Sequence, residues 1–232
     1  MEWPELLLID KPSGITSFDV IRRLRREYRD THDGDRAPKM GHAGTLDPLA
    51  TGLMLIGVGA GTKQLGQYLK LDKTYVASVL IGEQRTTGDM EGEVVSSKPV
   101  DESVKILQSK ISTELRAMSG TLTLPVSAYS AIKVDGVPMY KRARAAAKNG
   151  EQIPEVPLRE MHVIGAELTN INGVDGRVVA TIRFHVGSGT YIRSLAEELG
   201  RRLGYPACLA GLRRTTIGDF TVADARPVPS VQ

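Results

Sequence analysis

The chain alternates between short apolar runs and segments in which apolar residues recur every three or four positions. The runs have the length and the β-branched content of buried strands, and one of them alternates apolar with polar positions. We therefore predict strands at residues 6–9, 53–58, 73–82, 158–170, 177–187 and 207–215. The dipeptides Asn172-Gly173 and Asp175-Gly176 are typical of hairpin turns, so the strands on either side of them are expected to pair antiparallel.

Helical spacing of apolar residues appears in three longer segments. Val20, Ile21, Leu24 and Tyr28 predict a helix that Thr16 or Ser17 can cap. Two further helices are expected at residues 101–118 and after Gly189. Shorter helices are predicted at 62–70 and 139–148, and the polar segment 86–93 is expected to be a loop or hairpin.

Composition agrees with a soluble globular protein, because 41% of the 232 residues are hydrophobic and 25% are charged. No apolar run has the length of a membrane span, and the first residues do not resemble a secretion signal. The single Cys208 excludes an internal disulfide and a cysteine-based zinc site. We therefore expect a cytoplasmic protein without a membrane partner.

Charge is distributed unevenly along the chain, although the net charge is only +3. Lysine and arginine concentrate in the segments 22–39, 141–148 and 201–214, whereas acidic residues gather between 83 and 102. Clustered basic residues are typical of proteins that bind a polyanion such as nucleic acid. The alternative is that each cluster is an ordinary solvated helix face.

Residues 41–52 combine glycines, one histidine and one acid immediately before an apolar run. Asp47 precedes Pro48, so its backbone is expected to be extended or in a turn. Gly44 and Gly52 would allow the backbone of another molecule to come close. The segment is therefore either a loop that presents a reactive carboxylate or a polar turn before a buried strand.

Residues 57–63 offer a different possibility, a loop that binds the phosphates of a nucleotide. Thr62 precedes Lys63, whereas a Walker loop needs the lysine before the hydroxyl, and the spacing from Gly57 is too short. The segment does not match the dinucleotide-binding pattern either. We therefore predict no nucleotide cofactor.

The run Gly-His-Ala-Gly-Thr-Leu-Asp-Pro-Leu-Ala-Thr-Gly at 41–52, followed by Gly-Ala-Gly-Thr-Lys at 59–63, resembles the signature of TruB-type tRNA pseudouridine-55 synthases. Gly-Thr-Tyr-Ile-Arg at 189–193 and Leu-Arg-Arg-Thr at 212–215 resemble later motifs of that family. The resemblance implies an enzyme that isomerises a specific uridine in the T-arm of tRNA to pseudouridine. Because reactant and product are isomers, it also implies that the reaction needs no cofactor and no metal.

The fold that the resemblance implies is α+β, with a mixed, largely antiparallel central sheet, flanking helices, and an RNA cleft across one face of the sheet. One catalytic domain would span residues 1–232, without the C-terminal RNA-binding (PUA) domain that many members carry. An insertion at about 124–152 would clasp the T-arm, with Gly136 and Gly150 as hinges. The basic residues expected to contact RNA in it are Lys133, Lys141, Arg142, Arg144 and Lys148. We expect tRNA as the partner of a monomer that needs no second protein.

Site residues follow from the same resemblance. The aspartate of the family motif is catalytic, which places this role on Asp47. His42 would fill the space that the displaced base leaves, and Tyr75 would lie against the target base. Tyr191 would line the pocket, and Arg193 would pair with Asp47, because a guanidinium favours the charged form of a neighbouring carboxylate and fixes its direction.

Two weaker candidates complete the predicted site. Lys11 belongs to an Asp-Lys-Pro-x-Gly segment that also occurs in the family, so it is a candidate for substrate contact, and Leu212 belongs to the late motif. Each residue has a simpler interpretation, for example a surface lysine at Lys11 or a surface ion pair between Arg193 and Glu197. A non-catalytic RNA-binding protein is the alternative function, but binding alone would not require a carboxylate facing a polyanion.

Overall fold

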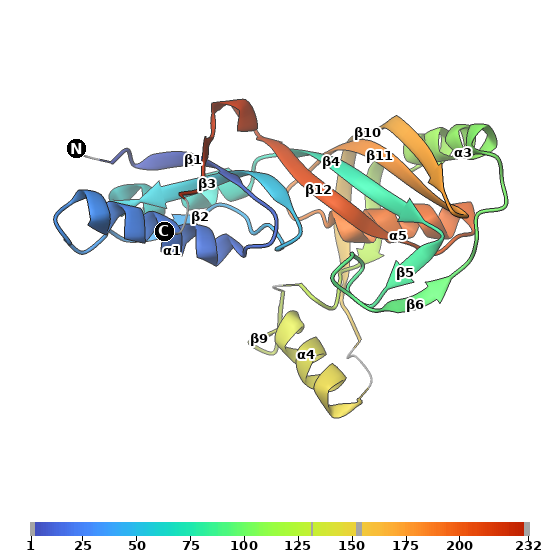
Figure 1. Ribbon diagram of the computed structural model, residues 1–232, viewed down its shortest axis with the longest axis horizontal. Coiled ribbons are helices and arrows are strands. Elements are labelled where there is room, and N and C mark those ends of the chain that lie inside the picture. Colours follow the sequence, from blue (N-terminus) through green and yellow to red (C-terminus); the bar gives the residue numbers. More distant parts are fainter. Residues whose placement is uncertain (1–2, 131, 152–154, 230–232) are drawn as a thin grey trace. The chain divides into compact units, whose positions relative to one another are not determined.

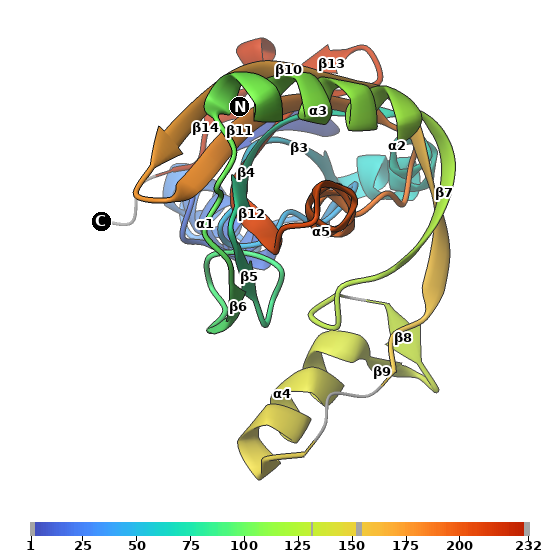
Figure 2. The same cartoon turned by 90° about the vertical axis from the view of Figure 1, so that its right-hand side faces the viewer.

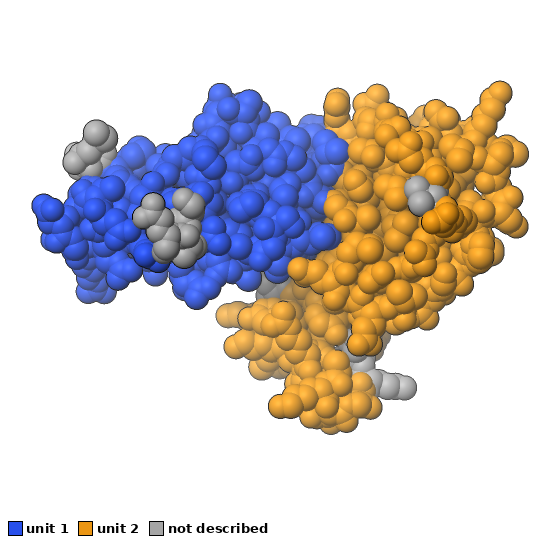
Figure 3. Space-filling view, in the orientation of Figure 1, with its two compact units in different colours: residues 1–76, 185–188, 212–232 blue, residues 77–184, 189–211 orange. Residues whose placement is uncertain are grey.

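The structure is a computed structural model that describes residues 3–130, 132–151 and 155–229 (Figure 1). The chain forms two compact units, which Figure 3 distinguishes by colour. Unit 1 comprises Met1–Val76, His185–Ser188 and Leu212–Gln232, and unit 2 comprises Ala77–Phe184 and Gly189–Gly211. Three strands contribute residues to both units, namely β4 (Lys73–Ile81), β11 (Arg177–Val186) and β12 (Ala207–Ile217).

Unit 1 is built on mixed strands in the order β14-β1-β3-β12, with β2 beside β3 and β13 beside β12. The pairs β1–β3, β2–β3 and β12–β13 are antiparallel, whereas β1–β14 and β12–β3 are parallel. The central strand β3 is apolar and buried over almost its whole length, as expected for a strand covered on both faces. The bounds are β1 (Leu6–Lys11), β2 (Met40–His42), β3 (Thr51–Val58), β13 (Phe220–Thr221) and β14 (Arg226–Pro227).

The main helix of unit 1 is α1 (Ser17–Thr31), which begins with a capping box. Thr16 accepts a hydrogen bond from the backbone of Asp19, and the Asp19 carboxylate accepts one from the backbone of Thr16. The residues Val20, Ile21 and Leu24 form its buried face, as their spacing predicts. The remaining helical elements of the unit are η1 (Gly59–Lys63), α2 (Leu65–Leu69) and η2 (Val222–Asp224).

Unit 2 contains β4, β11, β10 and β7 as neighbouring strands, and β10 pairs with β7 in antiparallel register. Helix α3 lies along β10 (Figure 2). Helix α5 packs against α3 and β7. Both ribbon views show α4 extending away from the sheet of its unit. The bounds are β5 (Glu83–Arg85), β6 (Val94–Ser97), α3 (Val104–Ala117), β7 (Gly120–Pro125), β8 (Lys133–Val134), β9 (Val137–Pro138), α4 (Met139–Asn149), β10 (Leu158–Val174) and α5 (Ile192–Leu203).

The predicted α+β class with a mixed, largely antiparallel sheet is confirmed, and so are the predicted strands, with small shifts of their ends. The prediction of a turn at Asn172-Gly173 is wrong, because these residues lie within β10. The hairpin turn is formed by Asp175 and Gly176, both of which have φ angles in the left-handed region. The single helix predicted at 62–70 is wrong as well, since η1 and α2 replace it. None of the helices in the described ranges is long and apolar enough to cross a membrane.

Candidate active site

Asp47 lies in a loop between β2 and β3, and its side chain is half-buried. The loop is closed locally by a hydrogen bond from the Ala50 amide to the Asp47 carbonyl at 3.1 Å. On one side, the hydroxyl of Ser17 at the start of α1 is 2.9 Å from both the amide and the carbonyl oxygen of Leu46. On the other side, the Gly14 amide donates to the Pro48 carbonyl at 2.9 Å. The backbone around the carboxylate is therefore fixed by elements of its own unit.

Lys11 makes a third attachment to this loop. Its side chain is fully buried, and its ammonium group donates to the carbonyls of Pro12 at 2.9 Å, Pro48 at 3.1 Å and Ala50 at 2.6 Å. The interpretation of Lys11 as a surface lysine is therefore wrong. Two of these carbonyls, those of Pro48 and Ala50, follow Asp47 in the loop, which fits a residue that positions the loop. The predicted contact of Lys11 with substrate stays a prediction.

Arg214 fixes the two ends of the same loop from β12. Its side chain is 1% exposed; Nε donates to the Leu53 carbonyl at 2.7 Å and Nη2 to the Gly44 carbonyl at 3.1 Å. Gly52 has a φ of +103°, and a Cβ atom there would overlap the backbone of Arg214. A glycine at this position is therefore required both by the backbone conformation and by the close approach of β12.

His42 belongs to unit 1 and is half-buried at the end of β2. Burial, and secondly the positive charge of Arg214, lower the pKa of His42 below its usual value of 6.5. Its Nδ1 atom is buried and has no hydrogen-bond partner among the described residues. At neutral pH this side chain is therefore an uncharged flat ring with one unsatisfied polar atom.

Two further predicted site residues also belong to unit 1. Tyr75 lies on β4 and is buried, with 8% of its surface exposed. Leu212 is half-buried on β12, and its carbonyl accepts a hydrogen bond from the Thr51 hydroxyl at 3.3 Å, next to the end of the Asp47 loop. Unit 1 thus contains Lys11, His42, Asp47, Tyr75 and Leu212 of the predicted site.

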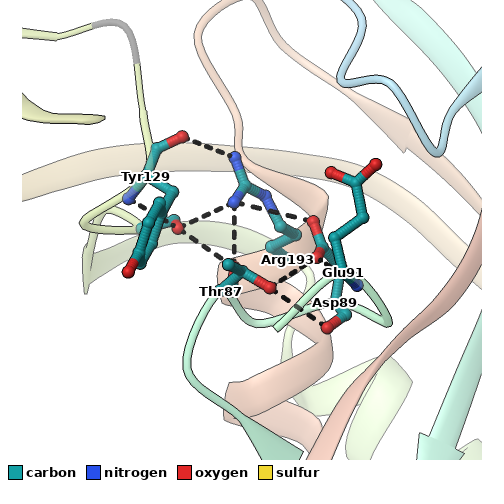
Figure 4. Close-up of polar contacts among 6 residues, drawn as sticks. Thr87, Asp89, Glu91, Tyr129 and Arg193 are labelled. Atoms are coloured by element: carbon teal, nitrogen blue, oxygen red, sulfur yellow. Dashed lines mark hydrogen bonds and ion pairs between the residues drawn. The ribbon is translucent and has the colours of Figure 1, made fainter. Parts of the chain in front are cut away.

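Arg193 lies at the start of α5 in unit 2 (Figure 4). Its side chain is 5% exposed, so the interpretation of Arg193 as a surface residue of the helix is wrong. Nη1 donates to the Thr87 carbonyl and to the Ser127 hydroxyl, both at 2.9 Å, and Nη2 donates to the Tyr129 carbonyl at 3.2 Å. The Asp89 carboxylate lies 3.7 Å from Nη1. The guanidinium therefore joins the β5–β6 loop to the segment that follows β7.

Tyr191 immediately precedes α5 and is half-buried. Like Arg193 it belongs to unit 2, whereas Asp47 belongs to unit 1. The predicted pair of Asp47 with Arg193, and the predicted place of Tyr191 in the pocket, stay predictions.

Comparison with known proteins assigns these motifs to one family. Residues 32–192 match the TruB family pseudouridylate synthase (N-terminal domain). The chain is 38% identical over 220 residues to tRNA pseudouridine synthase B of Corynebacterium diphtheriae, covering 95% of this chain and 69% of that protein. It is 39% identical over 227 residues to the protein of the same name from Leifsonia xyli, covering 98% of this chain and 71% of that protein.

The chain belongs to the TruB family of pseudouridylate synthases. It is therefore an isomerase. The fold agrees with that of solved structures: a chain of a Cbf5-Nop10-Gar1 complex has a TM-score of 0.65 at 23% identity, covering 96% of this chain and 52% of that chain. An archaeal box H/ACA Nop10-Cbf5 complex gives a TM-score of 0.62 at 24% identity, covering 96% and 51%.

The insertion predicted to clasp RNA in this TruB family member contains the β8–β9 hairpin and α4; its residues 131 and 152 lie outside the described ranges. Lys133 is exposed, as are Lys141, Arg144 and Lys148, which follow one another along one side of α4. Arg142 differs from them, because its guanidinium donates to the Val134 carbonyl at 2.6 Å and to the Asp135 carboxylate at 2.9 Å. It therefore attaches α4 to the hairpin.

The sequence places Arg214 in the Leu-Arg-Arg-Thr motif and in the basic segment 201–214, but neither pattern predicts that it holds the Asp47 loop. Arg214 is buried and so is not part of a basic surface, and Arg201, Arg202 and Arg213 pair with Glu198 or Asp10. Thr87, Asp89 and Ser127 were missed as well, since a polar loop does not show which distant side chain its carbonyls will meet. One signal in the sequence pointed to such residues. A buried Arg193 needs polar partners, so some polar loop had to supply them.

Proposed function

We propose that this chain converts one specific uridine in the T-arm of tRNA to pseudouridine, with Asp47 as the catalytic residue. The observation that carries the proposal is the half-buried Asp47 carboxylate on a loop that buried Lys11 and Arg214 hold in place. Such rigidity suits a group that must meet a reacting atom, because catalysis depends on positioning. The relatives named tRNA pseudouridine synthase B support tRNA as the substrate.

The reaction breaks the bond between C1′ of the ribose and N1 of the uracil, rotates the base, and joins C1′ to C5. The hydrogen on C5 leaves to solvent, and N1 gains one, so atoms balance without an oxidant or an energy source. Asp47 acts either by attack on the base ring or by removing a proton from the ribose to give an elimination intermediate. Both routes need an ionised carboxylate next to the target nucleotide.

A uridine in a folded arm must leave its stack before a carboxylate can reach it. His42 suits the space that the base leaves, because a neutral flat ring can stack there without bringing an unpaired charge between bases. Tyr75 and Tyr191 would contact the displaced base, and Leu212 and Lys11 would border it. Arg193 would orient Asp47.

Residues 1–232 would act as one catalytic domain in this proposal, as a monomer in the cytoplasm that needs no second protein. The insertion at about 124–152 would hold the T-arm. Its exposed Lys133, Lys141, Arg144 and Lys148 suit phosphate contacts. Arg142 would also contribute positive charge, while it holds the hairpin.

Tritium release tests the proposal directly. A T-arm stem-loop carrying tritium at uridine C5 is incubated with the wild-type chain, with Asp47→Asn, and with Asp35→Asn as a matched control in an exposed loop. We expect release by the wild type and by Asp35→Asn, and none by Asp47→Asn, which should still fold and bind the RNA. Normal release by Asp47→Asn, or no release by the wild type from bound RNA, would overturn the assignment.

A further inference from the structure

One side of α1 carries an exposed aromatic ring followed by exposed arginines. Phe18 is 57% exposed, and the side chains of Arg22, Arg26 and Arg29 are exposed as well. At the helical repeat these four residues lie within one narrow sector of the helix, away from its buried apolar side. We call these four residues the α1 stripe. Single exposed apolar residues are common at protein surfaces, so the distinguishing feature here is that the ring and the three arginines share one sector of the helix.

Acidic neighbours compensate the charge of the stripe only in part. Glu27 forms a two-pronged pair with Arg226, at 2.9 and 2.7 Å, and lies on another side of the helix. Asp19 contacts Arg22 but is also occupied by the helix cap. Asp30 lies 3.8 Å from Arg26, and both side chains are exposed, so this pair is weak. The stripe therefore has three guanidinium groups against the carboxylates of Asp19 and Asp30 and keeps a net positive charge.

The aromatic end of the stripe has the chemistry of a base-stacking platform. The Arg22 guanidinium lies 6.0 Å from the centre of the Phe18 ring, so a flat cation and a flat apolar ring are neighbours at the surface. Unpaired bases stack on exposed aromatic rings, and phosphates bind the arginines beside them. An acidic protein surface would use the charges but would have no need of the ring.

The stripe begins at the Asp47 loop. Ser17, whose hydroxyl contacts both backbone groups of Leu46, directly precedes Phe18 in the chain. The capping box fixes the start of the helix, so the direction of the stripe relative to the loop is fixed within unit 1. Because an α-helix rises 1.5 Å per residue, the stripe runs about 16 Å from Phe18 to Arg29.

We propose that the α1 stripe is a second RNA-binding surface, separate from the insertion. Phe18 stacks on an unpaired base near the target nucleotide, and Arg22, Arg26 and Arg29 bind the phosphates that lead away from it. The inference rests on the proposed function for the identity of the RNA. It adds a substrate contact in unit 1, the unit that contains Asp47.

The arginines are tested by the salt dependence of binding to a full-length tRNA transcript. Replacing Arg22, Arg26 and Arg29 together by Gln should lower the slope of log affinity against log salt by about 2 to 3. The matched control replaces Lys105, Lys110 and Arg116 by Gln, which removes the same charge from the exposed side of α3. We expect the control to keep the wild-type slope. Equal effects of the two triple variants, or no effect of the first, would overturn the inference.

Phe18 is tested by two single variants. Phe18→Ala should weaken tRNA binding about tenfold, because a stacked base is lost. Phe18→Trp should keep the wild-type affinity, since a larger ring preserves stacking. Position 18 is exposed on the helix, so both variants should have the melting temperature of the wild type. Wild-type affinity of Phe18→Ala would overturn the stacking role.

Failure of this inference can be distinguished from failure of the proposed function. If the α1 variants bind tRNA and release tritium as the wild type does, the stripe is not an RNA surface, and the proposed function stands. If the wild type binds tRNA but releases no tritium, the proposed function fails, and the binding comparison still decides on the stripe.

Discussion

The Lys11 ammonium group donates to the Ala50 carbonyl across 39 positions of sequence, at 2.6 Å and out of contact with solvent. Ala50 is three residues after Asp47, and its amide donates to the Asp47 carbonyl. One buried cation is therefore connected to the backbone of the proposed catalytic residue through a single residue, Ala50. Lys11, at the end of β1, thus supports the loop structurally, whatever contact it makes with RNA.

Lys11→Met should destabilise the fold, because the variant leaves buried carbonyls without their charged donor. A loss of about 3 kcal/mol in the free energy of unfolding is expected, together with a lower kcat, measured by urea unfolding and tritium release. Lys39→Met, at an exposed lysine just before β2, is the control and should change stability little. Wild-type stability of Lys11→Met would contradict the structural role.

Gly52 and Gly66 form a matched pair for testing the close approach of β3 and β12. Gly52→Ala should destabilise severely, because it combines a φ of +103° with overlap on the Arg214 backbone. Gly66→Ala lies in α2 with open space around it and should stabilise by about 0.5 to 1 kcal/mol. Thermal unfolding of both variants measures the difference. A Gly52→Ala protein with the melting temperature of the wild type would show that β3 and β12 can move apart without cost.

Arg193→Lys should loosen the insertion, because one ammonium group cannot reach the Thr87 carbonyl, the Ser127 hydroxyl and the Tyr129 carbonyl as a planar guanidinium does. We expect faster proteolysis within residues 132–151 and lower turnover. Arg201→Lys, an exposed residue on the same helix, is the control and should behave as the wild type. Unchanged proteolysis of Arg193→Lys would show that the network does not hold the insertion.

The elements of this fold were predictable wherever one side of a strand or helix is buried. The structure contains α1 and α5, which the apolar spacing predicts, and β11, which the alternation predicts, and their ends shift by a few residues. Asn172-Gly173 misled because two turn dipeptides follow one another closely in the sequence, and the hairpin between β10 and β11 uses the second, Asp175-Gly176. Both dipeptides favour a turn, so the local pattern alone does not decide between them.

The site was predictable as a set of motifs but not as a set of contacts. The motifs of Asp47, Arg193 and Arg214 all resemble those of a family, but the sequence does not show that Arg214 is buried against the Asp47 loop. Its burial depends on the carbonyls of Gly44 and Leu53, which lie about 160 to 170 positions away in the chain. A sequence pattern contains no record of which carbonyls will be left for a distant side chain to satisfy.

Acidification should destabilise the protein through His42. Burial and Arg214 lower the pKa of His42 in the folded state, so below the unfolded value of 6.5 the unfolded chain binds more protons. The free energy of unfolding should therefore fall as the pH drops below that value. Urea unfolding at a series of pH values should show a weaker fall for His42→Asn, which cannot titrate. Parallel curves for the two proteins would contradict a neutral buried imidazole.

The basic residues of α4 should separate into two groups by their effect on tRNA binding. Lys141, Arg144 and Lys148 are exposed, so replacing all three by Gln should lower the salt slope of binding by about 2 to 3 without changing stability. Arg142→Gln should instead free the β8–β9 hairpin, because it loses the bonds to Val134 and Asp135. We expect faster proteolysis of the insertion and a slope that falls by at most about 1, because a single charge is lost. Arg142→Gln could instead lower the slope as much as the triple variant does. That result would contradict separate phosphate contacts by the exposed residues of α4 and would show that the position of the hairpin controls binding.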